Sequence, residues 1–288
     1  MGIKLLCLDI DGTILNSRKE LTERTRQAVI YAQKMGVHVF LASGRSLPGL
    51  RELLQRLCLA QNCICMNGAL ICADGKEICR NGLEPFHLEK IMYTAEKYKS
   101  QVFFSGPDFN LTNQPLEGHL KEEVQKGSLR GDYIIRTDPL EFRREVKKLE
   151  NQILKAAVKE AGEENYQKMR TDLEAFGLFH IVKSDTHFID INPIGCTKGT
   201  GVRVTAEYLG IPMRDVMCIG DNENDEDMVA AAGIGVAMGN AEACVKKAAC
   251  YVTGTNDEDG AAAAIYHFIP ERPMWYKSGR EEIVGERD

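Results

Sequence analysis

The stretch LLCLDIDGT, residues 5–13 of this 288-residue chain, decides the fold. Its run LLCLDI over residues 5–10, apolar except for Asp9, predicts a parallel strand that is buried on both faces. Asp9 and Asp11 stand where this strand ends and a Gly-Thr turn begins. Ligands of open α/β sheets bind outside the carboxyl ends of the strands, so we expect a functional site here.

Strands and helices alternate along the chain on both sides of an atypical middle segment. Thr22 is a helix cap ahead of the second strand, and Asp74-Gly75 signals a hairpin after the third. The predicted core strands span residues 5–10, 37–42, 63–66, 216–220, 234–238 and 251–253. This alternation predicts an α/β fold, with a Rossmann-like parallel sheet as its core and helices on both faces.

The middle of the chain has longer charged helices and only short strands. We expect helices at residues 88–99, 140–149 and 163–175, and strands at residues 101–104, 152–156 and 178–182. This pattern indicates an inserted α+β domain. We therefore divide the chain into a first core part (residues 1–82), the insert (83–188) and a second core part (189–288).

Composition excludes several classes of function. A net charge of -6 without any run of Lys and Arg argues against a nucleic-acid partner. No apolar stretch approaches the ~18–20 residues of a membrane helix, so we expect no membrane partner. Five of the ten cysteines lie in apolar segments, and the cysteines lack zinc-site spacing. The start of the chain lacks the basic-then-apolar pattern of a signal peptide. We expect a reduced, cytoplasmic protein.

A second acidic cluster changes the interpretation of Asp9 and Asp11. By themselves, these two carboxylates could belong to an ordinary solvated turn. However, they project to the same side of a strand, where they repel each other unless a cation or proton is shared. Asp221 and Asp225 follow another buried strand and should lie on the same edge of the sheet. Oxygen ligands gathered in this way favour Mg²⁺.

Two further strand or loop ends offer groups that bind phosphate. Ser43, Gly44 and Arg45 follow the second strand and supply a hydroxyl and backbone N–H groups. Lys198 stands at a predicted helix N-terminus, which favours anions. Each segment alone is typical of a turn, and only their convergence on one edge favours a phosphate site.

These segments together resemble the haloacid dehalogenase-like (HAD) hydrolase superfamily. The motifs DIDGT at residues 9–13, Ser43 in ASGR, Lys198 and GDNENDEDM at residues 220–228 occur in the order of that superfamily. The segment Asn67-Gly68 and the run AGIGVAMGN at residues 232–240 are similar to its Cof-type sugar-phosphatase branch. That resemblance implies that the insert is an α+β cap.

The resemblance implies a role for each matched residue. Asp9 would attack phosphorus as nucleophile, and Asp11 would protonate the leaving oxygen and then activate water. Mg²⁺ would be held by Asp9, the Asp11 backbone carbonyl and Asp221, with Asp225 orienting its waters. The residues that would bind phosphate or substrate are Ser43, Gly44, Lys198, Asn224, Asn67 and Arg45.

The predicted function is Mg²⁺-dependent hydrolysis of a small phosphorylated metabolite, such as a sugar phosphate, through an aspartyl-phosphate. A phosphotransferase or phosphomutase and a non-catalytic phosphate-binding regulatory protein remain as alternatives. Asp190 and Asn192 are candidate contacts of the leaving group. The cap also has basic residues that could contact a second anion, although solvated surface charge explains them equally well: Lys121, Lys126, Arg130 and Arg136.

Overall fold

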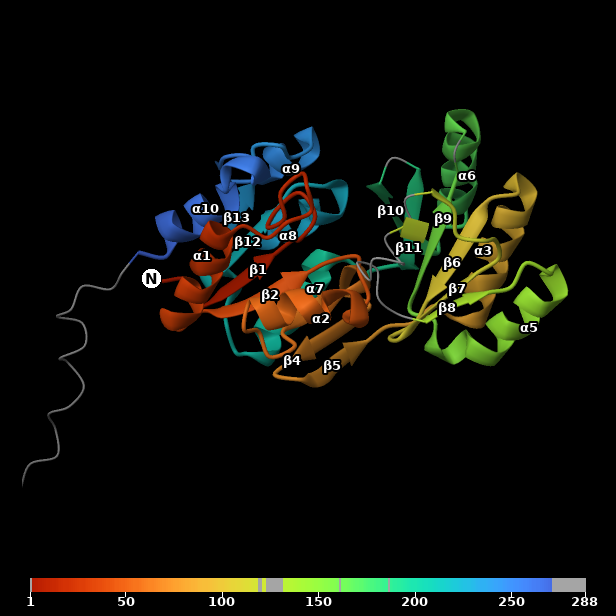
Figure 1. Ribbon diagram of the computed structural model, residues 1–288, viewed down its shortest axis with the longest axis horizontal. Helices are drawn as coiled ribbons and strands as arrows, with labels where there is room; N and C mark the ends of the chain where they lie inside the picture. The colour runs from red at the N-terminus through yellow and green to blue at the C-terminus, as the bar shows by residue number, and fades with distance from the viewer. Residues whose placement is uncertain (1, 119–120, 123–131, 161, 186, 271–288) are drawn as a thin grey trace, which may run out of the picture.

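A computed structural model describes residues 2–118, 121–122, 132–160, 162–185 and 187–270. Within these ranges the chain forms two β-sheets, each with its own cluster of buried apolar side chains (Figure 1). Lys126 and Arg130 lie outside the described residues. No helix in the described ranges is long and apolar enough to cross a membrane.

The larger sheet is the core of the α/β fold. Its eight strands have the order β14-β13-β12-β1-β2-β3-β4-β5. The pairs from β14 to β3 are parallel, whereas β4 and β5 form an antiparallel hairpin at the edge. The strands are β1 (Leu5–Leu8), β2 (His38–Ala42), β3 (Cys63–Cys65), β4 (Leu70–Ala73), β5 (Lys76–Arg80), β12 (Val216–Gly220), β13 (Ile234–Ala237) and β14 (Tyr251–Val252).

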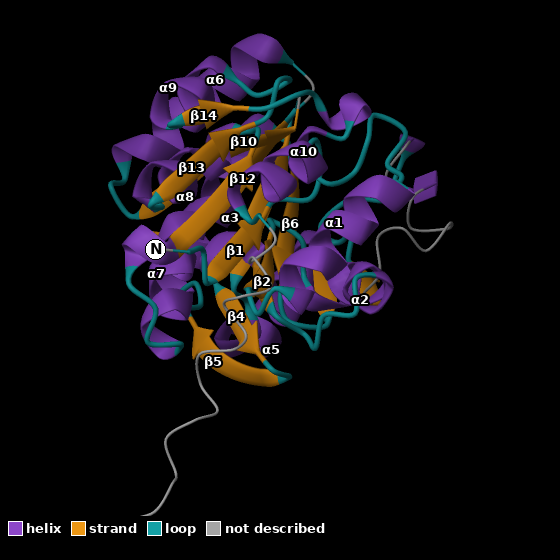
Figure 2. Ribbon diagram, turned by 90° about the vertical axis from the view of Figure 1, so that its left-hand side faces the viewer, coloured by secondary structure: helices purple, strands orange, loops and turns teal. Residues whose placement is uncertain are grey.

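Helices cover both faces of this sheet, as the alternation predicted. Figure 2 shows α1 and α10 on one side of the strands and α7 and α8 on the other. Thr22 caps α1 by accepting a hydrogen bond from the Thr25 backbone N–H. The core helices are α1 (Glu23–Lys34), α2 (Leu47–Arg56), α7 (Lys198–Tyr208), α8 (Glu226–Ala231), α9 (Ala243–Ala248) and α10 (Gly260–Phe268).

The smaller sheet forms the inserted cap. Its strand order is β10-β11-β9-β6-β7-β8, and only the β7–β8 pair is parallel. The strands are β6 (Gln101–Ser105), β7 (Phe109–Thr112), β8 (Asp132–Ile135), β9 (Lys155–Lys159), β10 (Phe179–Asp185) and β11 (Phe188–Pro193). The helices are α3 (Pro85–Tyr98), α5 (Pro139–Leu149) and α6 (Glu163–Ala175). The predicted α/β core with an α+β cap is therefore confirmed.

The strand expected at residues 152–156 begins three residues later than predicted. The chain leaves α5 through a short 3₁₀ turn, Glu150–Gln152, so that β9 starts at Lys155. Sequence patterns also missed β7, β8 and β11, which are short or carry polar residues. We propose the division at residues 1–82, 83–188 and 189–288 with its second boundary moved to residue 193, because β11 (Phe188–Pro193) is a strand of the cap sheet and returns the chain to the core.

Candidate active site

A cavity of about 610 Å³ lies between the carboxyl ends of the core strands and the cap sheet. Core and cap both contribute to its wall, as the position of ligand sites in α/β sheets leads one to expect. The core residues include Asp9, Asp11, Ser43, Gly44, Arg45, Lys198, Asp221, Asn222 and Asn224. The cap residues include Phe103, Ser105, Asn110, Tyr133, Lys155, Ala157, Lys183, Phe188 and Asp190.

At the base of this cavity, a buried lysine bridges two aspartates. Lys198 Nζ lies 2.7 Å from Asp9 Oδ1 and 2.6 Å from Asp225 Oδ1. Asp9 extends β1, Lys198 is the first residue of α7, and Asp225 ends the 3₁₀ turn η4 (Glu223–Asp225). All three side chains are at least nine-tenths buried. Burial opposes the charge on Lys198, but Asp225 and Asp9 outweigh it and raise its pKa.

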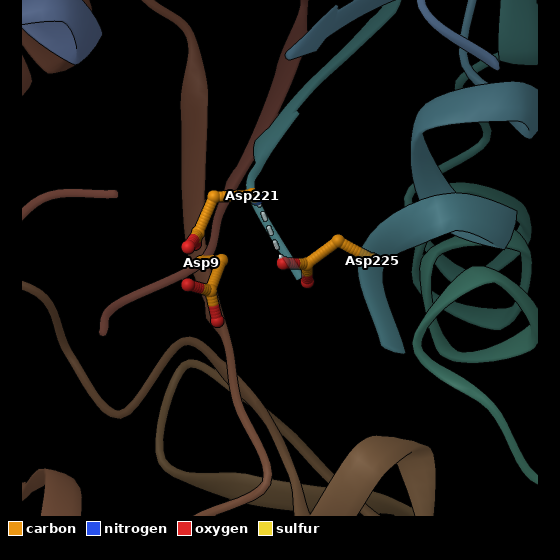
Figure 3. Close-up of side chains that lie close together, drawn as sticks. All are labelled: Asp9, Asp221 and Asp225. Atoms are coloured by element: carbon orange, nitrogen blue, oxygen red, sulfur yellow. Dashed lines mark hydrogen bonds between the residues drawn. The ribbon is translucent and has the colours of Figure 1, made fainter. Parts of the chain in front are cut away.

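Asp221 completes a cluster of three carboxylates with Asp9 and Asp225. One oxygen from each lies within 4.8 Å of the others, and Figure 3 shows Asp9 and Asp221 close to each other. Burial, followed by the charge of Asp225, raises the pKa of Asp9 to about 6. Burial, followed by Asp9 and Asp225, raises the pKa of Asp221 to about 9. Lys198 alone therefore does not neutralise this cluster, and its oxygen-only donor set fits a hard divalent cation such as Mg²⁺.

Backbone turns hold the acidic residues in place. Asp225 Oδ2 accepts hydrogen bonds of 3.0 Å from the backbone N–H groups of Asp221 and Asn222 (Figure 3 draws the first). Both oxygens of Asp225 thus have partners in the protein. Thr13 Oγ1 donates to Asp221 Oδ1 at 2.9 Å. Gly12 has a φ of +85°, and a Cβ there would lie 2.2 Å from Asp221 Oδ2, so only glycine fits this approach.

Asp11 points toward cations rather than toward Asp9. Its carboxylate receives two hydrogen bonds from Arg45, at 2.7 and 2.8 Å, and one from Lys19 at 3.0 Å. Burial raises its pKa, but Arg45 and then Lys19 outweigh burial, and the net pKa is lowered. In this conformation Asp11 is an ionised partner of Arg45. Proton donation by Asp11 therefore requires that the carboxyl leave this ion pair.

The expected phosphate-binding residues fall into two groups. Ser43, Gly44, Arg45, Lys198 and Asn224 line the cavity. Asn67 is not part of its lining, because its side chain is committed to other residues.

Asn67 is 1% exposed, and its Nδ2 donates to Asp190 Oδ2 at 3.0 Å and to Asn192 Oδ1 at 3.2 Å. Its Oδ1 accepts from Asn224 Nδ2 at 3.1 Å. These contacts favour a positioning role for Asn67 over direct contact with substrate.

Among the suggested cap contacts, Asp190 lines the cavity. Asn192 is fully buried and donates to the Met66 carbonyl at 2.9 Å. Arg136 pairs with Glu145 at 3.3 Å.

Several residues of the cavity could not be identified from the sequence. Lys155 fell near the end of the strand predicted at residues 152–156 rather than at its start, and a lone lysine in a charged cap gives no signal. Thr13 was quoted in the DIDGT motif without a role, although its position two residues after Asp11 was the available signal. The aromatic residues Phe103 and Phe188 belong to strands that are 85 residues apart in sequence, so only the fold brings them into one wall.

The chain matches the family model of the haloacid dehalogenase-like hydrolases over residues 6–265. It is 31% identical over 271 residues to the 5-amino-6-(5-phospho-D-ribitylamino)uracil phosphatase YcsE of Bacillus subtilis, with 93% of this chain and 97% of that protein covered.

Among solved structures, a haloacid dehalogenase-like hydrolase from Bacteroides thetaiotaomicron has a TM-score of 0.79 at 29% identity, covering 92% of this chain and 99% of that one. A HAD subclass IIB sugar phosphatase has a TM-score of 0.78 at 28% identity, covering 92% and 98% of the two chains. The resemblance of the motifs is thereby confirmed. The chain belongs to the haloacid dehalogenase-like hydrolases, in their Cof-type branch, and is a phosphatase enzyme.

Proposed function

We propose that this phosphatase hydrolyses a small phosphorylated metabolite, most simply a sugar phosphate, with Asp9 as nucleophile and Mg²⁺ as cofactor. The observation that carries the proposal is the buried contact of Lys198 with both Asp9 and Asp225, beside Asp221, at the base of the cavity. This arrangement gathers a nucleophilic carboxylate, a fixed positive charge and further acidic ligands where a phosphate can enter. Phosphoryl transfer depends chiefly on such positioning and charge neutralisation.

The residues that would hold Mg²⁺ are Asp9 and Asp221 through their carboxylates and Asp11 through its backbone carbonyl. The ion supplies charge neutralisation that lets an anionic phosphate approach an anionic carboxylate. Asp225 orients this region through the backbone of its own loop and through Lys198. Because both oxygens of its carboxylate are hydrogen-bonded within the protein, we propose that Asp225 acts on the metal site indirectly.

Asp9 is suited to attack phosphorus because its pKa of about 6 leaves it ionised at neutral pH. The attack forms an aspartyl-phosphate, which splits one hydrolysis into two displacement steps. Ser43, Lys198 and Asn224 line the cavity beside Asp9 and would bind the phosphoryl oxygens. Asp11 would donate a proton to the leaving oxygen once substrate displaces its carboxyl from Arg45, and would then take a proton from the attacking water.

The relatives support the substrate class. YcsE is a phosphatase of a phosphorylated ribitylamino compound, and a solved structural neighbour is a sugar phosphatase. Both names describe small, hydroxylated phosphate esters. A cavity of about 610 Å³, closed on one side by the cap, is the size of a small-molecule site. We also propose that the enzyme works in the cytoplasm, where its ten free cysteines stay reduced.

Two alternatives use the same residues. A phosphomutase would share the aspartyl-phosphate on Asp9 but pass the phosphoryl group to a sugar hydroxyl. A regulatory phosphoacceptor would have no need of Asp11 or of a cavity enclosed by a cap. Neither is favoured by a specific contact in the structure.

The test is to measure phosphate release from a panel of phosphate esters with Mg²⁺ and with EDTA. We expect turnover only with the metal, and we expect Asp9→Asn to abolish it while the protein stays folded by circular dichroism. An Asp172→Asn variant is the control, because this aspartate lies on the cap helix α6 and pairs with Lys97. More than a few per cent residual activity in Asp9→Asn would refute the nucleophile; phosphosugar isomerisation without phosphate release would favour the mutase.

A further inference from the structure

A lysine from the cap lies inside the active-site cavity. Lys155 is the first residue of β9, its side chain is 10% exposed, and it forms part of the cavity wall. Burying an ammonium group is costly unless the group is paired. The position of Lys155 is therefore maintained by specific partners.

Those partners come from both halves of the molecule. Lys155 Nζ forms an ion pair with Asp190 Oδ2 of β11 and donates a hydrogen bond of 3.0 Å to the Gly44 carbonyl of the core. In the part of the chain that the structure describes, these are the two polar contacts of Lys155. An ammonium group has three donors, so one hydrogen remains for a ligand in the cavity.

Asp190, the anionic partner, is itself held rigidly. It is 2% exposed, and its Oδ2 also accepts from Asn67 Nδ2 at 3.0 Å. Asn67 adopts a left-handed backbone conformation, with φ of 55°, and its side chain also contacts Asn192 and Asn224. A non-glycine residue persists in that conformation where surrounding contacts fix it. The ammonium group of Lys155 is thus presented by a preorganised polar network.

The location of Lys155 defines which part of a ligand it would meet. Gly44 follows Ser43, one of the proposed phosphate-binding residues, so the ammonium lies at the junction of the phosphate site and the cap. Further along the same strand, Ala157 also lines the cavity, and Phe188 adds an aromatic ring. The cap wall of the cavity therefore carries an ionic group next to Gly44 together with apolar side chains.

We propose that Lys155 is a specificity-determining residue, which binds a hydroxyl oxygen of the leaving group close to the phosphoester. This inference rests on the proposed function and narrows its substrate class to phosphate esters that carry a hydroxyl near the phosphorylated carbon. Such a hydroxyl accepts a hydrogen bond from Lys155 and can donate one to Asp190. A methylene group at the same place does neither, and leaves the third N–H of the buried ammonium group without an acceptor.

The test compares two matched substrates in the full-length enzyme with Mg²⁺. One is the best substrate from a panel of polyol and sugar phosphates, and the other is the straight-chain alkyl phosphate with the same number of carbons. The readout is the ratio of the two kcat/KM values for the parent, for Lys155→Met and for Lys155→Arg. Lys148→Met is the control, because Lys148 lies on cap helix α5 with a 73% exposed side chain.

We expect Lys155→Met to lower kcat/KM for the hydroxylated ester by roughly 10- to 100-fold, the effect of one hydrogen bond to a charged group. The alkyl ester should lose much less, so that the ratio collapses, and Lys155→Arg should restore part of it. Lys148→Met should keep the parental ratio. An equal loss on both substrates would show a merely structural lysine and overturn the inference, as would an unchanged ratio.

Folding is checked separately by thermal unfolding. If Lys155→Met does not fold, Asp190→Asn carries the same test, because it removes the anionic partner of Lys155 while keeping side-chain size; an unchanged ratio in this variant would overturn the inference. Failure of the proposed function looks different, since the parent itself would then release phosphate from neither ester.

Discussion

Replacement of Asp221 by Asn should stabilise the metal-free protein while destroying its activity. Burial, together with the charges of Asp9 and Asp225, raises the pKa of Asp221 from 3.8 to about 9. The folded protein therefore binds more protons than the unfolded chain between these two pH values. The free energy of unfolding consequently falls as pH rises through this window, and an uncharged amide removes that loss.

The size of the gain follows from the pKa shift. Each pH unit above the ordinary pKa costs about 1.36 kcal/mol, so Asp221 reduces stability by at most about 4 kcal/mol at pH 7. Asp9 contributes to this cost, because its charge raises the pKa of Asp221, and its own pKa is raised by burial and by Asp225. We expect Asp221→Asn to recover about 2–4 kcal/mol at pH 7 and less at pH 5.

The assay is urea unfolding of parent and variant in EDTA at several pH values, repeated with Mg²⁺. Mg²⁺ should stabilise the parent and leave Asp221→Asn unchanged, which reverses their order of stability if the ion is bound tightly. Asp172→Asn is the control of opposite sign, since Lys97 and then Tyr98 lower the pKa of Asp172. A variant no more stable than the parent at pH 7 in EDTA would refute this reasoning.

Two further substitutions test the buried charges and the tight turn. Lys198→Met should lower the free energy of unfolding in urea by about 3–5 kcal/mol, because it leaves two buried carboxylates unpaired. The control Lys4→Met should lower it far less, since the Lys4 side chain is 58% exposed. Equal losses in the two variants would contradict the argument. Gly12→Ala and Gly36→Ala should each lower the free energy of unfolding by roughly 1–2 kcal/mol, because alanine is strained at the positive φ of these positions. Gly12→Ala should also weaken Mg²⁺ binding, measured by calorimetry, by about tenfold or more, because its Cβ would displace Asp221. Gly36→Ala should leave Mg²⁺ binding unchanged, because a Cβ there meets nothing within 4 Å. An unchanged affinity in Gly12→Ala would contradict the geometry.

Local patterns were enough to predict the core, because a parallel sheet buried on both faces leaves long apolar runs. The strand Val216–Gly220 was predicted with the bounds that the structure shows. The hairpin at Asp74-Gly75 is likewise present, with both residues at positive φ as such a turn requires. The cap was harder to predict, because its strands are short and interrupted by charge.

The sequence by itself determined the family, the α/β core and the acidic motifs that meet at one sheet edge. It could do so because strand ends in a parallel sheet converge whatever the loops between them do. Only the tertiary structure decided how each side chain is used there. In the folded protein, Asp11 pairs with Arg45, and Asp225 contacts Lys198 and the loop backbone. Lys155 of the cap donates a hydrogen bond to the Gly44 carbonyl of the core. These contacts join residues 34, 27 and 111 positions apart, and no local periodicity encodes which charged groups fold into contact.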